Sequence, residues 1–279
     1  MTDKAHRPLV AVIVAAYNEQ ASIELCLKSL NEQTYSPLEV IVVDDGSTDA
    51  TAEIARRYAT KVLQQTHRGP GAARNLGASR TEARILVFAD ADMSFHPEFV
   101  ERLVEPIIAG AAAGTFTREE YVRNWNSRLA RCWNLNNGLT TPRRHPEGFP
   151  ERDWVYRAID RDAFDRAGGY QDVGYGEDAA LGRKIGDMAV AVPGAICYHD
   201  NPSTWRDVFL SARWYGRGET VDRSWRGILN LTLPWSLKKS LRRAISCREP
   251  LFPVFKVVHD FAVLVGIIET RFLGRGHKK

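Results

Sequence analysis

Two carboxylates, Asp90 and Asp92, directly follow the apolar run 85–89, Ile-Leu-Val-Phe-Ala. A run of that length, bounded by charged residues, predicts a buried strand. Carboxylates held one residue apart at a strand end repel each other and lose hydration, which disfavours their charged forms. A divalent cation removes this penalty, and oxygen ligands suit Mg2+ or Mn2+, often together with substrate phosphates. The spacing therefore indicates a metal-dependent phosphate site at a strand end, although Asp-x-Asp can also be a solvated turn.

Three further polar motifs occur at comparable places along the chain. Tyr17-Asn18-Glu19 ends the apolar run 9–16, and Asp-Asp-Gly-Ser-Thr-Asp at 44–49 ends the run 39–43. Glu177-Asp178 lies where a helix is expected to begin. Ligands of open α/β sheets bind at the carboxyl ends of the strands, and parallel strands end along one edge. We therefore expect these side chains to converge on one crevice.

The elements that would position these motifs alternate through the first half of the chain. Strands are predicted near 9–15, 39–43, 61–65 and 85–89, and helices near 20–33, 49–58 and 71–79. Strands that are apolar throughout and alternate with helices predict an α/β fold, with a mostly parallel sheet covered on both faces.

The second half of the chain is less regular. The segment 110–155 is rich in Arg, Asn and Trp, and 140–150 contains three prolines, which is typical of a loop. Regular structure is expected again further on, as a helix near 160–167, a helix from 177, a strand pair near 188–199 and a helix near 204–217. The irregular segment holds no readable signature of an acceptor.

The composition of the chain is that of a globular protein. Its 279 residues, 44% of them hydrophobic, suffice for one large domain or for one domain with an appendage. The four cysteines are far apart and form no Cys-x-x-Cys pair, so we expect neither a disulfide framework nor a zinc site. This use of cysteine predicts a reducing compartment. The apolar run 9–16 is too short for a secretory signal and predicts a strand.

Charge is unevenly distributed along the chain. Residues 223–279 hold 12 Lys and Arg against 3 Asp and Glu, a net charge of +9, whereas residues 1–222 carry −5. A basic tail on an acidic body indicates an anionic surface as partner. The segment 251–273 is apolar, but its longest uncharged run is eight residues. A membrane-spanning helix needs about 20 apolar residues, so we expect none there.

The tail segment 235–245 has the pattern of an amphipathic helix. Leu237, Leu241 and Ile245 form one stripe. The opposite face is basic and consists of Lys238, Lys239, Arg242 and Arg243. Such a helix lies well on an anionic membrane surface. A helix packed on the body of the protein and a dimer interface stay open as alternatives for the tail.

Five motifs in a fixed order resemble those of the inverting glycosyltransferases of family 2, which have the GT-A fold. They are Val12–Glu19, Val42–Asp49, Gly71–Gly77 (Gly-Ala-Ala-Arg-Asn-Leu-Gly), Asp90–Asp92 and Gly174–Asp178. Each motif is weak alone, but all five in this order are highly specific. The resemblance covers residues 8–217 and implies a GT-A type α/β fold for that part of the chain.

The resemblance implies a nucleotide-binding role for several of these residues. Tyr17, Glu19 and Asp44 would line the nucleoside pocket, with Asp44 accepting a hydrogen bond from the base. Arg74 would lie near the nucleotide, and Asp90 would contact the ribose or the metal. The full nucleotide-binding set is Ala15, Tyr17, Glu19, Asp44, Arg74, Asp90 and Ala91.

The resemblance also implies a metal site. Asp92 would ligate the metal that bridges the diphosphate, and many family members carry a His near the position of His199. A neutral imidazole is a competent ligand, although a partly buried structural His stays open for His199. A metal ion would stabilise, as a Lewis acid, the charge that grows on the leaving diphosphate.

Asp178 would be the general base for the acceptor hydroxyl. An inverting displacement needs a base on the face opposite the leaving group. A helix N-terminus stabilises a carboxylate by about 0.3–1 kcal/mol, which keeps it available as a proton acceptor. The alternative is that Glu177 and Asp178 only favour the start of a helix. Glu177, Arg213 and Trp214 are expected near the donor sugar or the acceptor.

Departures from related patterns argue against other activities, and a haloacid-dehalogenase-like phosphatase stays as a less favoured alternative. Processive polysaccharide synthases carry Gln-x-x-Arg-Trp, where this chain has Leu210 in place of Gln and lacks multiple transmembrane segments. The glycine-rich segment 69–74 has Arg74 where a dinucleotide fingerprint needs its third glycine, which argues against an NAD enzyme. A haloacid-dehalogenase-like phosphatase would leave Asp44 and Glu177-Asp178 unexplained.

The sequence therefore predicts a GT-A catalytic domain over 1–222 and a basic amphipathic helical extension over 223–279. The expected activity is metal-dependent transfer, with inversion, of a sugar from a UDP, GDP or dTDP type donor to an acceptor hydroxyl, using Mg2+ or Mn2+. We expect a lipid-linked or glycan acceptor, in envelope polysaccharide or glycolipid assembly, and a cytoplasmic location, at a membrane face if the tail binds lipid. No nucleic-acid partner is expected, and a homodimer stays open. The competing hypothesis is a nucleotide-sugar-binding protein without turnover.

Overall fold

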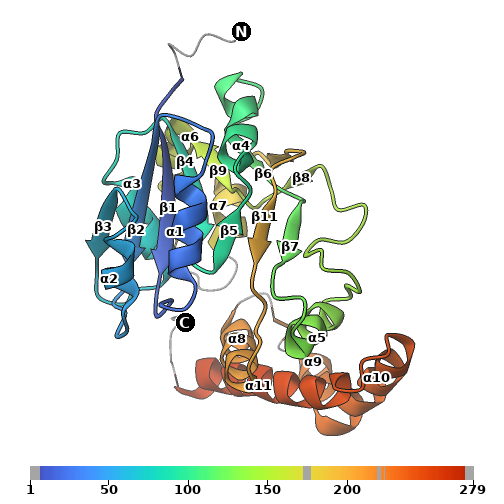
Figure 1. The fold of residues 1–279 in the computed structure, drawn as a ribbon. Helices are drawn as coiled ribbons and strands as arrows, with labels where there is room; N and C mark the ends of the chain where they lie inside the picture. The colour runs from blue at the N-terminus through green and yellow to red at the C-terminus, as the bar shows by residue number, and fades with distance from the viewer. Residues whose placement is uncertain (1–6, 172–176, 219–220, 223, 274–279) are drawn as a thin grey trace. The chain divides into compact units, whose positions relative to one another are not determined.

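The computed structural model describes residues 7–171, 177–218, 221–222 and 224–273 (Figure 1). The first three residues of the motif Gly174–Asp178 lie outside the described residues. The chain divides into two compact units. The first unit comprises 1–120, 147–172 and 177–198, and the second comprises 121–146, 173–176 and 199–279.

The first unit is built on an eight-stranded sheet with the order β3-β2-β1-β4-β9-β6-β10-β8. Strands β3, β2, β1 and β4 are parallel, and β9 runs antiparallel to both β4 and β6. The mostly parallel sheet predicted from the sequence is thus confirmed. The strand bounds are β1 (Val10–Ala16), β2 (Leu38–Asp44), β3 (Lys61–Gln64), β4 (Ile85–Asp90), β6 (Gly114–Phe116), β8 (Arg152–Asp153), β9 (Ala158–Asp160) and β10 (Ala189–Ala191).

Helices cover both faces of this sheet because its central strands are apolar on both sides. In β1, Val12 belongs to the core under α1 and α4, whereas Ile13 belongs to the core under α3, α6 and α7. Gly77 of α3 lets that helix approach the sheet closely, since a Cβ there would lie 2.5 Å from Ile13 Cγ2. The helix bounds are α1 (Ile23–Asn31), α2 (Thr51–Ala55), α3 (Pro70–Ala78), α4 (Phe99–Ile108), α6 (Arg161–Ala167) and α7 (Glu177–Ile185).

A separate three-stranded sheet has the order β5-β11-β7, formed by β5 (Met93–Phe95), β11 (Cys197–His199) and β7 (Glu120–Val122). Both strands expected near 188–199 are present, but they do not pair with each other, because β10 and β11 belong to different sheets. The chain leaves the large sheet after β10 through a turn at Gly194, whose φ is +79°. Periodicity identified both strands, but their partners come from elsewhere in the sequence.

The second unit contains five helices among its described residues: α5 (Arg128–Asn136), α8 (Trp205–Arg217), α9 (Trp225–Asn230), α10 (Leu233–Ser246) and α11 (Phe252–Leu273). Helices α8 and α11 pack closely through Gly216 and Gly266, because a Cβ on either glycine would overlap a backbone carbonyl of the facing helix. The sequence pattern missed α5, whose polar and aromatic residues obscure its helical spacing. Among the described residues, no helix combines the length and apolar character needed to cross a bilayer.

Helix α10 exists as predicted, but its packed face is not the apolar stripe. Ser236, Ser240 and Ala244, spaced four residues apart, are buried. Leu241 and Ile245 are 52% and 79% exposed. Ala244 lies in one hydrophobic cluster with Phe252 and Phe255 of α11. The small side chains thus take the packed side of α10, whereas Leu241 and Ile245 face solvent.

Candidate active site

The carboxyl ends of the parallel strands bring the sequence motifs to one edge of the sheet. Ala16 pairs in register with Asp44, and Ala15 pairs with Asp90. On the next strand, Gln64 pairs with Asp44. The ends of β1, β2, β3 and β4 are therefore aligned, as the parallel arrangement predicts.

The turn after β2 is built on two buried carboxylates. Asp44 accepts hydrogen bonds from the backbone N–H of Ser47 and from Nε2 of Gln64, both at 3.0 Å. Asp45 accepts from the backbone N–H groups of Arg68 and Gly69, both at 2.8 Å. The second contact ties this turn to the loop before α3, so Asp45 joins two segments of the predicted nucleoside site.

An aromatic pair lies beside this turn. The Tyr17 ring stacks on the imidazole of His67 with the centroids 4.1 Å apart and an interplanar angle of 24°. Nδ1 of His67 lies 2.9 Å from Oδ2 of Asp45. Sequence reasoning identified Tyr17 but missed His67, whose only signal is its place just before the glycine-rich turn. Stacked rings anchored by a carboxylate offer a flat surface at the predicted nucleoside site.

Glu19 has a local structural contact besides its predicted role. Its Oε2 accepts a hydrogen bond from the hydroxyl of Ser22 at 2.6 Å, and its backbone N–H donates to Thr51 Oγ1 at 2.8 Å. These bonds connect the end of β1 to the starts of α1 and α2. The nucleoside-lining role of Glu19 stays a prediction.

Arg74 of α3 joins three of the predicted site carboxylates. Its side chain is 5% exposed and donates from Nη2 to Oδ1 of Asp90 at 2.7 Å. Nη1 donates to Oε1 of Glu177 at 2.5 Å and to Oδ1 of Asp178 at 3.2 Å. The guanidinium also lies over the Tyr170 ring, 5.3 Å from its centroid. Burial alone would lower the pKa of Arg74, but Asp178 and Asp90 raise it well above its ordinary value.

Glu177 is the first residue of α7 and is buried. Its Oε2 accepts a hydrogen bond from the backbone N–H of Gly71 at 3.1 Å, where α3 begins. Burial raises the pKa of Glu177 to about 7, with Asp178 adding to the rise and Arg74 opposing it. Glu177 therefore fixes Arg74 and connects the N-terminal turns of α3 and α7.

Asp178 differs from its neighbour in accessibility. Its side chain is 35% exposed, although Oδ1 contacts Arg74. It lies in the first turn of α7, where the helix dipole favours the carboxylate. A carboxylate that is oriented and still accessible can accept a proton from a bound hydroxyl.

A second arginine, which sequence reasoning missed, contacts Asp90. Nη1 of Arg157 lies 3.5 Å from Oδ2 of Asp90, and its Nη2 lies 3.7 Å from Oε2 of Glu120. Burial would lower the pKa of Arg157, but Asp90 and Glu120 raise it. No motif marks Arg157 in the sequence, because it lies in the loop before β9. Asp90 is thus oriented by two guanidinium groups.

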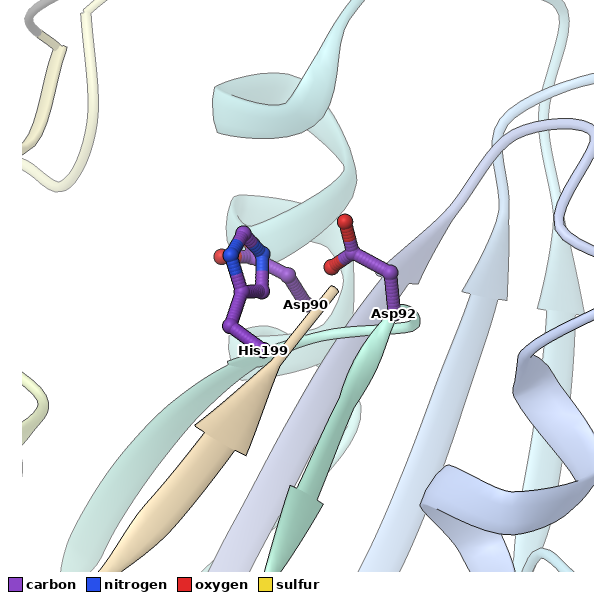
Figure 2. A group of neighbouring side chains, drawn as sticks. All are labelled: Asp90, Asp92 and His199. Atoms are coloured by element: carbon purple, nitrogen blue, oxygen red, sulfur yellow. The ribbon is translucent and has the colours of Figure 1, made fainter. Parts of the chain in front are cut away.

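Three side chains have the composition of a metal-binding group. Asp90, Asp92 and His199 each offer a ligand atom, and these atoms all lie within 4.8 Å of one another (Figure 2). The two carboxylates stand at either end of the short turn between β4 and β5, and His199 is the last residue of β11. Carboxylate oxygens and an imidazole nitrogen fit Mn2+ or Mg2+.

The predicted residues Arg213 and Trp214 lie on α8 in the second unit. Arg213 donates to Glu269 of α11 from Nε at 2.8 Å and from Nη2 at 2.6 Å. Its guanidinium therefore has a structural partner. A place near the sugar or the acceptor stays a prediction for both residues, as the nucleotide contact does for the buried Ala91.

Solved structures share the fold of this chain. One is the mannosyltransferase PcManGT from Pyrobaculum calidifontis in complex with GDP-Man and Mn2+, with a TM-score of 0.61 and 19% identity, covering 97% of this chain and 89% of that one. Another is S. aureus TarS 1-349 in complex with UDP, with a TM-score of 0.57 and 17% identity, covering 95% and 92%. At these identities the likeness shows the shared GT-A architecture.

Sequence comparisons match part of the chain to known glycosyltransferases. Glycosyltransferase AglE of Haloferax volcanii is 42% identical over 108 residues, which are 36% of this chain and 36% of AglE. The chain thus spans about a third of the length of the curated relatives it matches. The family model described as glycosyl transferase family 2 matches residues 11–168, more than half of the chain and all the strands that carry the predicted nucleotide site. The chain belongs to glycosyl transferase family 2.

Proposed function

We propose that this protein transfers a sugar, with inversion, from a nucleoside diphosphate donor to an acceptor hydroxyl. The observation that carries the proposal is the position of Arg74, which binds both the candidate base Asp178 and the candidate diphosphate-side acid Asp90. One buried guanidinium thereby holds the two ends of the reaction at a defined separation. Such positioning is a large part of enzymatic rate enhancement.

The donor would bind across the carboxyl edge of the sheet. The stacked pair of Tyr17 and His67 would present the outer face of one ring to the nucleobase. Asp44 would accept a hydrogen bond from the base. Solved relatives of the fold bind UDP, UDP-GlcNAc and GDP-Man. For this chain the donor nucleotide stays open among the UDP, GDP and dTDP types.

The metal ligands are proposed to be Asp92 and His199. Asp90 is already engaged by Arg74 and Arg157, which favours a role for it in orienting the nucleotide. A bound Mn2+ or Mg2+ would act as a Lewis acid toward the diphosphate leaving group. The PcManGT structure contains Mn2+, which supports a divalent ion at this site.

Asp178 would act on the acceptor. Its carboxylate would take the hydroxyl proton while the hydroxyl oxygen bonds to the anomeric carbon and the bond to the diphosphate oxygen breaks. One displacement of this kind inverts the anomeric centre. Arg74, which contacts Oδ1 of Asp178, would orient its carboxylate.

For the acceptor and the cellular setting we propose only a class. A lipid-linked or glycan acceptor, used in envelope polysaccharide or glycolipid assembly at a cytoplasmic membrane face, agrees with the basic segment 223–279. The same segment is proposed as an extension of a catalytic domain over 1–222.

The substitution Asp178→Asn tests the base. We expect release of nucleoside diphosphate from the cognate nucleotide sugar to fall by about 10²–10⁴-fold, the typical loss for a general base. Donor binding should persist, because the nucleoside side of the site is untouched. A matched control is Asp162→Asn, which changes an exposed aspartate in the first turn of α6.

Thermal shifts with UDP, GDP and dTDP, with and without Mn2+, identify the donor and verify that the variant still binds it. A ligand at 100 times its Kd stabilises by about 2.7 kcal/mol, so the cognate nucleotide should stand out. Unchanged turnover in Asp178→Asn would refute the base. Nucleotide binding without any turnover by the wild-type protein, with all candidate acceptors, would favour the binding protein without catalysis.

A further inference from the structure

The outward face of α10 exposes large apolar side chains to solvent. Trp235, Leu241 and Ile245 are 42%, 52% and 79% exposed. They are outside because Ser236 and Ser240 take the packed side of the helix. Burial of such side chains is favourable only where a partner removes their apolar surface from water.

The same face carries positive charge. At 3.6 residues per turn, the residues of this face fall within an arc of about 120° on the helix, which we call the α10 face. They are Trp235, Lys238, Leu241, Arg242 and Ile245. The ammonium of Lys238 lies 5.4 Å from the centroid of the Trp235 ring. Cations and apolar groups are thus interleaved on one side of α10. The expectation that Lys238 and Arg242 lie on the face opposite Leu241 and Ile245 is therefore wrong, because these residues fall within the same arc of the helix.

The segment that contains α9 and α10 supplies no acidic residue of its own. Residues 223–248 contain seven Lys and Arg and no Asp or Glu. The next acid, Glu249, is buried and bonded to Arg128 and Arg131. The preceding helix repeats the pattern, since Arg226 and the 53% exposed Leu229 lie three residues apart on α9.

We propose that the α10 face is a docking surface for an anionic lipid bilayer. Leucine and isoleucine enter the boundary of headgroups and acyl chains, tryptophan prefers that interface, and Lys and Arg bind anionic headgroups. A bilayer accommodates both kinds of side chain at once. The sequence pattern suggested a membrane-facing tail, but the packing of α10 decides which residues reach the lipid.

Two other binding partners would match either the charges or the apolar side chains of the α10 face, but not both. A nucleic acid would pair with Lys238 and Arg242 but would leave Leu241 and Ile245 in water. A second copy of the chain, docked by the same face, would bury the apolar groups but would set these cations against their own copies, because a twofold interface is self-complementary.

The inference rests on the proposed function only for its purpose, which is to bring the enzyme to a lipid-linked acceptor. Vesicle binding needs neither donor nor acceptor. Failure of docking and failure of sugar transfer are therefore separate results.

The experiment measures cosedimentation of the full chain with vesicles of phosphatidylcholine, with and without phosphatidylglycerol. We expect binding to the anionic vesicles alone. Lys238→Gln with Arg242→Gln should weaken it by about thirtyfold, from about 1 kcal/mol per cation. Leu241→Ser with Ile245→Ser should weaken it by at least about tenfold. The matched control is Leu25→Ser, since Leu25 is 46% exposed on α1 and should have no effect.

Circular dichroism of each variant checks that the fold is retained, which solvent-exposed positions should allow. Two results would overturn the proposal: wild-type protein that ignores anionic vesicles, or variants of both kinds that bind them as the wild type does. A dimer in solution that Leu241→Ser with Ile245→Ser dissociates would assign the face to a second copy and would equally overturn it.

Discussion

At the scale of residues, the site is a cluster of acids held by two arginines. Asp90, Glu177 and Asp178 contact Arg74, and Arg157 contacts Asp90 from another side. The carboxylates outnumber the guanidinium groups even before Asp92 is included. A divalent cation would correct this imbalance, which is why the charge of the site supports the proposed metal.

The pKa of Glu177 is raised from its ordinary 4.5 to about 7, and we therefore expect the stability of the protein to depend on pH. Stabilisation by its protonated form is fully present below pH 4.5 and is lost as the pH rises through 7. The free energy of unfolding of the wild-type protein should therefore fall relative to Glu177→Gln over this window. The full shift corresponds to about 3 kcal/mol.

Urea unfolding at several pH values, without metal or nucleotide, measures this difference. Glu53→Gln at an exposed position of α2 serves as the matched control for the substitution itself. A constant gap between wild type and Glu177→Gln would contradict the raised pKa.

At the scale of elements, the pair α8 and α11 is held by close backbone packing and by one acid. Glu269 of α11 binds both Arg213 and Arg217 of α8, at 2.6 and 2.7 Å. The motif that drew attention to Arg213 therefore has a structural function in the second unit. Its charge is engaged within that unit, which the sequence motif does not reveal.

The substitution Glu269→Gln should destabilise the protein at pH 7 by roughly 1–3 kcal/mol, since it leaves two arginines without their carboxylate. The hydrogen bonds from Arg213 and Arg217 lower the pKa of Glu269 from 4.5 to about 2. Its contribution is present above pH 4.5 and is lost as the pH falls toward 2.

Denaturant unfolding at pH 7 and at successively lower pH values tests this, and the gap between wild type and variant should close on acidification. Glu98→Gln breaks an exposed helical pair with Arg102 and should cost less than about 1 kcal/mol. A Glu269→Gln protein as stable as the wild type at pH 7 would show that the pair contributes nothing net.

At the scale of the whole molecule, the Arg74 cluster and the exposed cationic helices are assigned to different units. The parallel sheet and the Arg74 cluster belong to the first unit, whereas α9 and α10 belong to the second. Each unit has its own hydrophobic core. Ligands of the two units should therefore protect different backbone segments.

Hydrogen exchange distinguishes the two responses. Nucleoside diphosphate with Mn2+ should slow exchange at 15–19, 44–48, 67–75 and 90–92, because ligand binding suppresses local opening there. Anionic vesicles should instead slow exchange in α9 and α10. Nucleotide that protects α10 and leaves the strand ends unchanged would contradict the assignment of the site.

Much of the site could be predicted from the sequence because its determinants are local. Alternating apolar runs identify β1, β2, β3 and β4, and parallel strands must end on one edge. Asp44, Asp90 and Asp92 follow those ends directly, so their place on that edge follows from chain order. The ordered motifs then indicate the family.

The tertiary structure alone decided the partners of these residues. Arg157 lies 67 residues from Asp90 along the chain, and Glu177 lies 103 residues from Arg74. No periodicity encodes such contacts, because they depend on how separate helices and loops pack. The same holds for His67 beside Tyr17 and for the separation of β10 from β11.

The tail shows most clearly what the sequence determines and what the tertiary structure decides. By itself, the sequence determined that residues 223–248 are cationic and that 235–245 form a helix with exposed and packed sides. The sequence did not determine which side packs, because an apolar stripe and a stripe of small residues can each form the packed side of a helix. Close packing favours Ser236, Ser240 and Ala244, which let the helices approach. Leu241 and Ile245 are therefore left for a partner outside the fold.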